Sequence, residues 1–383
     1  MIRKFVVRGG VGLVLLATAI GAGWILSLPP TPAAGAAPAI PPEETAAMIA
    51  ALKPPKRVRP LVAIVGINDA TETTDYLMPY GILKRADVAD VVLLATKPGP
   101  VSLFPALQVE PEATIEAFDA QHPEGADYVI VPAMSRDDDP AVMQWLKSQA
   151  EKGARVIGVC AGAKVVAAAG LLDGKRATTH WYYLDVLRKN HPAIRYVPDR
   201  RIVVDENVAT TTGISASMPA MLFLIEAIAG RDKAEAVAGD LGVPSWDARH
   251  ASGAFKFTRP FALTALGNVL AFWRREEHGI ALTPGMDEVA LALVADAWSR
   301  TYRSRALTFA ASQDAVATRN GMRVRPDRVA TDWQAEERLP APDSRPPAEA
   351  LDETLRAIAA RYGAGTANLV AMQLEYPRQT RGQ

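Results

Sequence analysis

The stretch that decides the fold is "VIGVCAGAKVVAAAGLLDGKRATTHW", residues 156–181, which contains the only cysteine among 383 residues. Cys160 lies in a Gly-x-Cys-x-Gly pattern, after an apolar run and before an alanine-rich, helix-forming segment. This pattern is typical of a nucleophile elbow, a strand-to-helix turn that holds its central residue in a strained conformation between small neighbours. We expect an exposed thiol that the N-terminus of the following helix helps to ionise. The alternative is a buried packing residue, which is the common fate of a free cysteine.

The segments around this elbow predict an α/β fold. Apolar, β-branched runs predict buried strands over 60–67, 89–96, 127–133 and 154–160. Helix-like periodicity occupies the segments between and after them, near 75–86, 138–151, 161–171 and 215–229. This alternation predicts a doubly wound parallel sheet sandwich over residues 58–239, with helices on both faces. Open sheets of this kind bind ligands at the carboxyl edge of their strands, where Cys160 would lie.

The remaining C-terminal region, 240–383, is predicted to be mainly helical or α/β. Amphipathic periodicity predicts helices over 260–279, 286–304 and 348–362, with a strand-like run after the second. Residues 95–118 and 310–333 share a Val, Gly, Val, Pro order at similar places. This echo raises the hypothesis of a degenerate half-repeat of the first domain.

The N-terminus predicts a membrane anchor. Residues 9–28 form an uncharged run of 20 residues, about the length of a membrane-spanning helix, and Arg3, Lys4 and Arg8 precede it. By the positive-inside rule the N-terminus would be cytoplasmic and the rest periplasmic or extracytoplasmic, in a single-pass protein. Residues 1–28 could also be a signal peptide that is cleaved among the small residues 33–37. Residues 29–57, rich in proline and alanine, predict an extended linker.

Composition narrows the choice of partners. Lysine plus arginine equals aspartate plus glutamate, at 42 each, so no basic field favours nucleic acid as a partner. The five histidines lack the spacing of metal ligands, and we therefore predict no metal and no cofactor. A small-molecule substrate or ligand is the expected partner, besides the membrane at the N-terminal helix.

Two stretches carry a family resemblance: "VCAGAKVVAAAGLLDGKRATTHW", residues 159–181, and "ATTTGISASMPAMLFLIEAIAG", residues 209–230. They resemble the ThiJ/PfpI superfamily, also called class I glutamine-amidotransferase-like, over about residues 60–230. The likeness extends to its deglycase-like branch and to domains attached to transcription regulators. It implies a flavodoxin-like sandwich, and it is compatible with a homodimer because many proteins of this superfamily pair.

The resemblance also implies site residues. Cys160 matches the elbow cysteine, and His180 matches a histidine that approaches it in the deglycase-like branch. Asp75, four residues before Pro79, matches an acid that donates a hydrogen bond to the thiolate, and Glu72 is the alternative acid. A protonated carboxyl group can hold a thiolate while an imidazole moves protons. The alternative roles are a helix N-cap for Asp75 and simple packing for His180.

This chain departs from the superfamily at two places. Ala133 and Met134 replace a Gly-Gly pair whose amides form an oxyanion hole, which puts that function in doubt. Ala161 stands where the peptidase-like branch has a histidine, which argues against peptidase chemistry. We nevertheless expect Ala161, Ala133 and Met134 to line the oxyanion site or pocket.

Three functions remain open. The first is a hydrolase or lyase in which Cys160 attacks a small electrophile, such as an α-oxoaldehyde, its adduct, an isocyanide or an amide. The second is a non-enzymatic sensor of a small molecule or an oxidant that uses the same cysteine pocket. The third is a scaffold whose C-terminal helices contact a partner.

Overall fold

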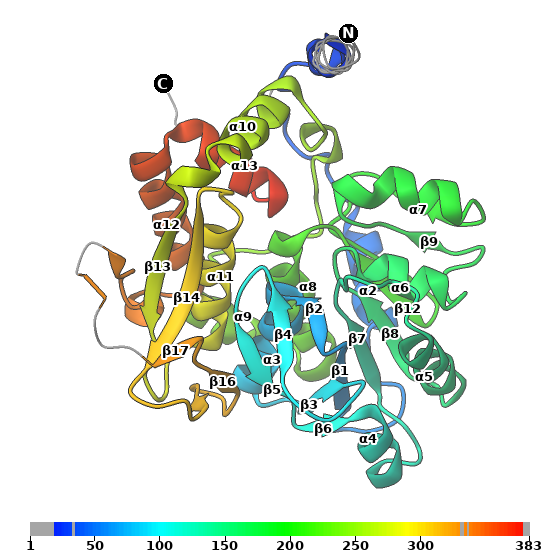
Figure 1. Ribbon diagram of the computed structural model, residues 1–383. Helices are drawn as coiled ribbons and strands as arrows, with labels where there is room; N and C mark the ends of the chain where they lie inside the picture. Colours follow the sequence, from blue (N-terminus) through cyan, green and yellow to red (C-terminus); the bar gives the residue numbers. More distant parts are fainter. Residues whose placement is uncertain (1–18, 33–34, 330–332, 335–336, 378–383) are drawn as a thin grey trace, which may run out of the picture.

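The computed structural model describes residues 19–32, 35–329, 333–334 and 337–377. Its centre is a seven-stranded sheet in the order β11-β12-β8-β7-β1-β3-β6 (Figure 1). The strands are β1 (Leu61–Gly66), β3 (Asp90–Ala95), β6 (Ala113–Thr114), β7 (Tyr128–Val131), β8 (Arg155–Gly158), β11 (Ile202–Asp205) and β12 (Val208–Thr211). The predicted buried strands are confirmed, and they pair in parallel. The prediction of an all-parallel sheet is wrong, because β11 turns back at the edge and pairs antiparallel with β12.

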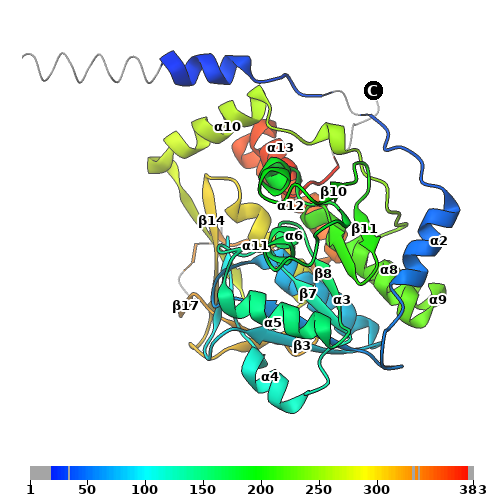
Figure 2. The same ribbon diagram turned by 90° about the vertical axis from the view of Figure 1, so that its right-hand side faces the viewer.

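Helices cover both faces of this sheet, as predicted (Figures 1 and 2). One face carries α3 (Thr73–Ala86), α8 (Ser217–Ala229) and α9 (Arg231–Leu241), and the other carries α4 (Ile115–Gln121), α5 (Pro140–Glu151) and α6 (Gly162–Ala168). Successive residues of β1 show the division: Val62 and Ile64 join one apolar core, and Ala63 and Val65 join the other. A strand buried on both sides in this way explains why β1 is apolar throughout.

The C-terminal region contains more β-structure than predicted. It comprises α10 (Arg259–Leu270), β13 (Glu276–Ala281), α11 (Glu288–Ser299), β14 (Ser304–Ala310), β15 (Val316–Ala317), β16 (Arg323–Arg325), β17 (Arg328–Val329), α12 (Pro347–Tyr362) and α13 (Ala364–Gln373). β13, β14 and β17 form a parallel sheet of three strands. The predicted helix over 260–279 is therefore wrong in its second half, where β13 begins.

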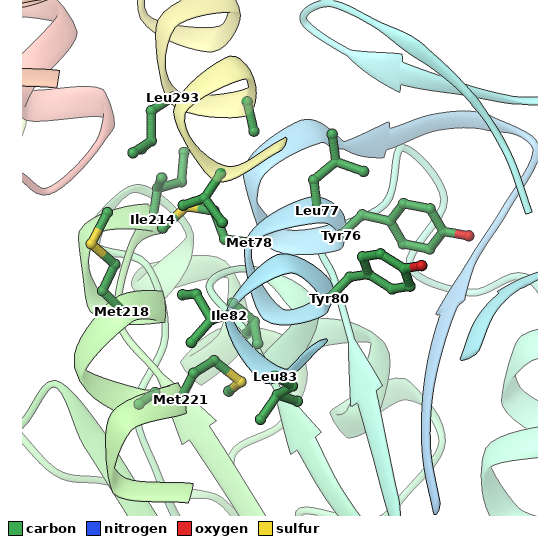
Figure 3. Packing of buried hydrophobic residues seen from close by; sticks show 14 of the residues in the cluster. Tyr76, Leu77, Met78, Tyr80, Ile82, Leu83, Ile214, Met218, Met221 and Leu293 are labelled. Carbon is green, nitrogen blue, oxygen red and sulfur yellow. The ribbon is translucent and has the colours of Figure 1, made fainter. Parts of the chain in front are cut away.

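The C-terminal region and the first domain share a sheet and a core. β15 and β16 join β5 (Gln108–Glu110), β4 (Val101–Phe104) and β2 (Asp69–Glu72) in a mixed sheet of five strands. α11 packs against α3, whose opposite flank packs on α8 (Figure 3). The boundary near residue 239 stays a prediction, and the parts on either side of it are in extensive contact.

The predicted membrane-spanning helix over residues 9–28, and the single-pass placement that followed from it, are wrong. None of the helices in the described part of the chain combines the length and apolar character needed to cross a membrane. Residues 9–18 lie outside the described residues, and residues 19–27 form a helix beside α10 (Figure 2).

The predicted linker contains a folded segment. Residues Pro42–Ala51 form the helix α2, and Leu52 directly after it is buried. Glu44 on this helix pairs with Arg200 at 2.6 Å, between Oε1 and Nε. The extended part is therefore shorter than the composition of residues 29–57 suggests.

Candidate active site

Cys160 forms the predicted elbow between β8 and α6. Its φ angle is +56°, in the left-handed region that residues with a Cβ rarely adopt. Small neighbours permit the turn: a Cβ at Gly158 would lie 3.0 Å from the backbone of Ala163, and one at Gly162 would lie 1.9 Å from the carbonyl oxygen of Val131. The glycines of the sequence pattern are therefore required by close backbone approach.

The thiol is buried, so the prediction of an exposed thiol is wrong. Cys160 is only 5% exposed and belongs to the core that contains α3 and α8. Its backbone N–H donates to the hydroxyl of Thr211 at 3.0 Å, and its carbonyl accepts from the hydroxyl of Thr179 at 3.1 Å. The loops after β9 (Arg176–Ala177) and β12 therefore fix the elbow from two sides.

The predicted ionisation of the thiol by the helix is also wrong in this conformation. Burial raises the pKa of Cys160 well above its usual value, and the negative charges of Asp75, Glu72 and Glu375 raise it further. The N–H of Ala161 favours the thiolate and only partly offsets these effects. Cys160 is therefore a neutral thiol at neutral pH while the site is closed.

Asp75 has the burial and bonding expected of a protonated acid. It is fully buried, and burial followed by the charge of Glu72 raises its pKa well above the usual value. Oδ2 accepts from the N–H of Ala133 at 3.2 Å, whereas Oδ1 has no hydrogen-bond partner among the described residues. A proton on Oδ1 can therefore be donated within the site, and a neutral Asp75 no longer opposes ionisation of Cys160.

Glu72, the alternative acid, caps α3 instead. Its Oε2 accepts from the N–H of Asp75 at 2.6 Å and from the hydroxyl of Thr74 at 2.9 Å. Its Oε1 lies 2.6 Å from Nη2 of Arg300. Asp75 is therefore not the helix cap, and Glu72 is held as a carboxylate by a buried arginine and the helix N-terminus.

His180 is near the elbow, but neither ring nitrogen is free. Its Nδ1 accepts from the N–H of Tyr182 at 3.2 Å, so its Nε2 carries the proton and donates to the carbonyl of Gln373 at 2.9 Å. Burial lowers the pKa of His180, which keeps the ring neutral. In this arrangement His180 holds the C-terminal segment and cannot exchange protons with a substrate.

The predicted oxyanion residues divide into two groups. The N–H of Ala133 is committed to Asp75, and Met134 forms a bridge with Thr71 and packs on the opposite core. The N–H of Ala161 is the donor that is directed at the sulfur. Of the three residues, only Ala161 has a geometry suited to stabilising charge at the site.

A C-terminal segment that the sequence did not indicate closes the site. Glu375 is buried, and its two carboxylate oxygens accept from the N–H groups of Trp181, at 2.7 Å, and Gly213. Ser215 donates from its N–H to the carbonyl of Leu374 at 3.0 Å. These contacts join residues 374–375 to the two loops that hold the backbone of Cys160.

A Glu375→Ala variant is expected to expose Cys160. Losing the carboxylate leaves two buried N–H donors without an acceptor, which weakens closure of the segment. We expect iodoacetamide to alkylate Cys160 at least about tenfold faster than in the parent protein, because the open state becomes more populated. Glu349→Ala, which removes an exposed glutamate of α12, is the matched control and should leave the rate unchanged. Equal rates for Glu375→Ala and the parent would contradict the closing role.

Arg300 and Asp296 are the other residues that sequence reasoning missed. They lie four residues apart, with Nε of Arg300 2.7 Å from Oδ2 of Asp296, and both are buried beside Glu72. Their signal was two charged residues at helical spacing in an otherwise apolar helix. No metal-ligand cluster of histidine, cysteine, aspartate or glutamate occurs in the described residues.

Comparison with known proteins identifies the first domain. The model of the DJ-1/PfpI family matches residues 62–227. The chain is 35% identical over 168 residues to isonitrile hydratase of Pseudomonas putida, covering 43% of this chain and 70% of the relative. It is 31% identical over 171 residues to the HTH-type transcriptional regulator CdhR of Pseudomonas aeruginosa, covering 43% of this chain and 47% of the regulator.

Solved structures show the same likeness. A ThiJ/PfpI family protein from Pseudomonas syringae aligns with a TM-score of 0.46 and 22% identity, covering 62% of this chain and 93% of that one. The resemblance inferred from the elbow and its flanking segments is thus confirmed by the family model and by the match to isonitrile hydratase. The chain belongs to the DJ-1/PfpI family.

Proposed function

We propose that the protein is an enzyme of hydrolase or lyase type in which Cys160 attacks a small electrophilic carbon. The observation that carries the proposal is the pairing of a strained elbow cysteine with a buried carboxylic acid. Asp75 raises the pKa of the thiol through its charge, which places the two groups close together, and its Oδ1 has no other partner in the described chain. A buried acid of this kind can donate a proton at neutral pH.

Addition of water to an isocyanide illustrates the chemistry, because one relative is named isonitrile hydratase. The sulfur of Cys160 forms a bond to the terminal carbon, which receives the thiol proton through Asp75, to give a thioimidate. Water then adds to that carbon, the nitrogen takes a proton, and the carbon–sulfur bond breaks. The products are an N-substituted formamide and the regenerated thiol, so the net change is the addition of one water.

His180 has a different role in this proposal from the one that the resemblance implied. Both of its nitrogens are engaged, so Asp75 carries the proton transfers and His180 positions Gln373. The substrate reaches Cys160 only after the segment around Glu375 moves. Ala161 supplies an N–H toward the sulfur and the reacting carbon.

Cys160→Ser and Asp75→Asn variants test this function with cyclohexyl isocyanide and methylglyoxal as substrates. We expect the parent protein to turn over at least one of them. Cys160→Ser should lose at least about a thousandfold of kcat/KM, and Asp75→Asn about a hundredfold or more, because nucleophile and acid are both required. Asp138→Asn, which changes an exposed aspartate, is the control. Turnover that survives in Cys160→Ser would contradict the proposal.

A second candidate is a sensor, and the closed thiol favours it. Cys160 is buried, its pKa is raised, and His180 is fully bonded, as suits a group that reacts only when a ligand or oxidant opens the site. Labelling of Cys160 without turnover of either substrate would support the sensor over the enzyme. Because one relative is a transcriptional regulator, the absence of a nucleic-acid partner stays a prediction.

A further inference from the structure

The order of elements in residues 61–114 recurs in residues 276–329. In the first set, β1 and β3 pair in parallel around α3, a hairpin of β4 and β5 follows, and β6 returns parallel to β3. In the second set, β13 and β14 pair in parallel around α11, β15 and β16 form the hairpin, and β17 returns parallel to β14. The two sets have the same topology.

The spacing between the two sets is constant. β13 begins 215 residues after β1, at Glu276 rather than Leu61, and β16 begins 215 residues after β5, at Arg323 rather than Gln108. The same spacing relates α11 to α3, β15 to β4 and β17 to β6. Residues identical at this spacing include Arg85 and Arg300, Val101 and Val316, Val109 and Val324, and Pro111 and Pro326. The second set is therefore a degenerate copy of the first without insertion or deletion.

The two copies face each other as the subunits of a symmetric dimer would. β5 and β16 pair antiparallel, and the equivalent residues Val109 and Val324 lie directly opposite each other. Antiparallel pairing of equivalent strands about equivalent residues is what a two-fold axis produces. The equivalent helices also meet, with Leu293 of α11 beside Met78 of α3 (Figure 3).

Two ion pairs follow the same symmetry. Asp287 is the N-cap of α11 as Glu72 is the N-cap of α3. Arg300 at the end of α11 pairs with Glu72, and Arg85 at the end of α3 pairs with Asp287. Each arginine therefore reaches across the pseudo-two-fold axis to the other copy's helix cap. Only the Arg300 pair adjoins a cysteine, because the half-copy ends before any counterpart of β8.

We propose that the C-terminal half-copy is an internal partner subunit. It occupies the surface of α3 and β5 on which a second chain would pack, and it supplies Arg300 to the Cys160 site as a positioning residue. The chain is therefore a monomer through this face. The surface claim stands independently of the proposed function, whereas the role of Arg300 rests on Cys160 being the reactive group.

Arg300 acts by balancing the acids around the thiol. The titratable and charged groups that face Cys160 come from α3, the C-terminal segment, the loop after β9 and the end of α11: Asp75, Glu72, Glu375, Tyr183 and Arg300. Arg300 is the cation in this set, and a thiolate at Cys160 interacts favourably with it. Removing the arginine leaves Glu72 as an uncompensated charge beside the thiol.

An Arg300→Met variant compared with Arg85→Met tests the positioning role, because the two arginines are symmetry counterparts. The measurement is the pH profile of the alkylation of Cys160 by iodoacetamide. We expect Arg300→Met to shift the profile to higher pH and slow the reaction at pH 7.5 by about tenfold, one unit of pKa. Arg85→Met should keep the parent profile although it loses an equivalent pair. If Arg300→Met does not fold, Arg300→Lys and Arg85→Lys carry the comparison. Identical profiles for the two positions would overturn the role of Arg300.

A Val109→Cys/Val324→Cys variant tests the internal partner. Opposed residues of an antiparallel pair are close enough for a disulfide, and the native Cys160 is buried. After oxidation we expect a cross-linked chain of monomer size on a denaturing gel, and a monomer by light scattering. A disulfide-linked dimer would overturn the proposal. Both readouts are independent of turnover, so a failure of the proposed enzymatic function would leave them interpretable.

Discussion

A Gly162→Ala variant is expected to lose most of the folding stability of the first domain. A Cβ at this position would lie 1.9 Å from the carbonyl oxygen of Val131, which already accepts from the N–H of Val159 at 2.9 Å. The obstructing atom is backbone in a central strand, so β7 and the elbow would have to separate. We expect a loss of about 3–5 kcal/mol or more in the free energy of unfolding, which is large against typical stabilities of about 5–15 kcal/mol. Chemical denaturation followed by circular dichroism measures it.

Gly239→Ala is the matched control for this substitution. Gly239 lies in α9, and a Cβ there would have no heavy atom within 4 Å. Alanine is the better helix former, so we expect the control to gain about 0.5–1 kcal/mol. A Gly162→Ala protein as stable as the parent would show that β7 and the elbow can move apart. The tightness of the elbow, on which the strain at Cys160 depends, would then be wrong.

Local patterns in the sequence were sufficient for the elbow and the central strands. The two glycines around Cys160 and the apolar run before it follow from contacts within a few residues, and the structure has them as predicted. Asp75 was found only through the family resemblance, because its distance from Cys160 in the sequence conceals their proximity. The faint echo between residues 95–118 and 310–333 was the one signal of the half-copy, and its elements are in register with those of the first copy.

Long-range contacts explain what sequence reasoning missed. The exposure and ionisation of Cys160 were predicted from the elbow alone, but a segment more than 200 residues away covers the site with Glu375. His180 likewise loses its free nitrogen to the backbone of Gln373. Backbone carbonyls have no sequence signature, so such partners cannot be read from residue types. The buried charge of Arg300 becomes meaningful only once α11 is placed against α3.

The acids of the site are expected to make the protein less stable as the pH rises from about 4 to about 7. Burial raises the pKa of Asp296 to about 7, and the charge of Glu72 raises it further while Arg300 opposes the change. The folded state therefore binds this proton more tightly than the unfolded chain, in which an aspartate titrates near 3.9. Stability is greatest below the unfolded pKa and falls as the pH rises through the folded pKa. For Asp296 the total is on the order of 4 kcal/mol, and Asp75 acts in the same direction.

An Asp296→Asn variant should remove its part of this pH dependence. Asparagine resembles the protonated acid and cannot ionise, so we expect the variant to match the parent near pH 5 and to be equally or more stable at pH 8. Urea midpoints measured at several pH values give the slope, and Asp138→Asn should keep the slope of the parent. A strong destabilisation of Asp296→Asn at pH 8 would show that the ionised pair with Arg300 outweighs the burial of Asp296. In that case Asp296 would be a permanent carboxylate, and Arg300 would balance two fixed negative charges beside Cys160 rather than one.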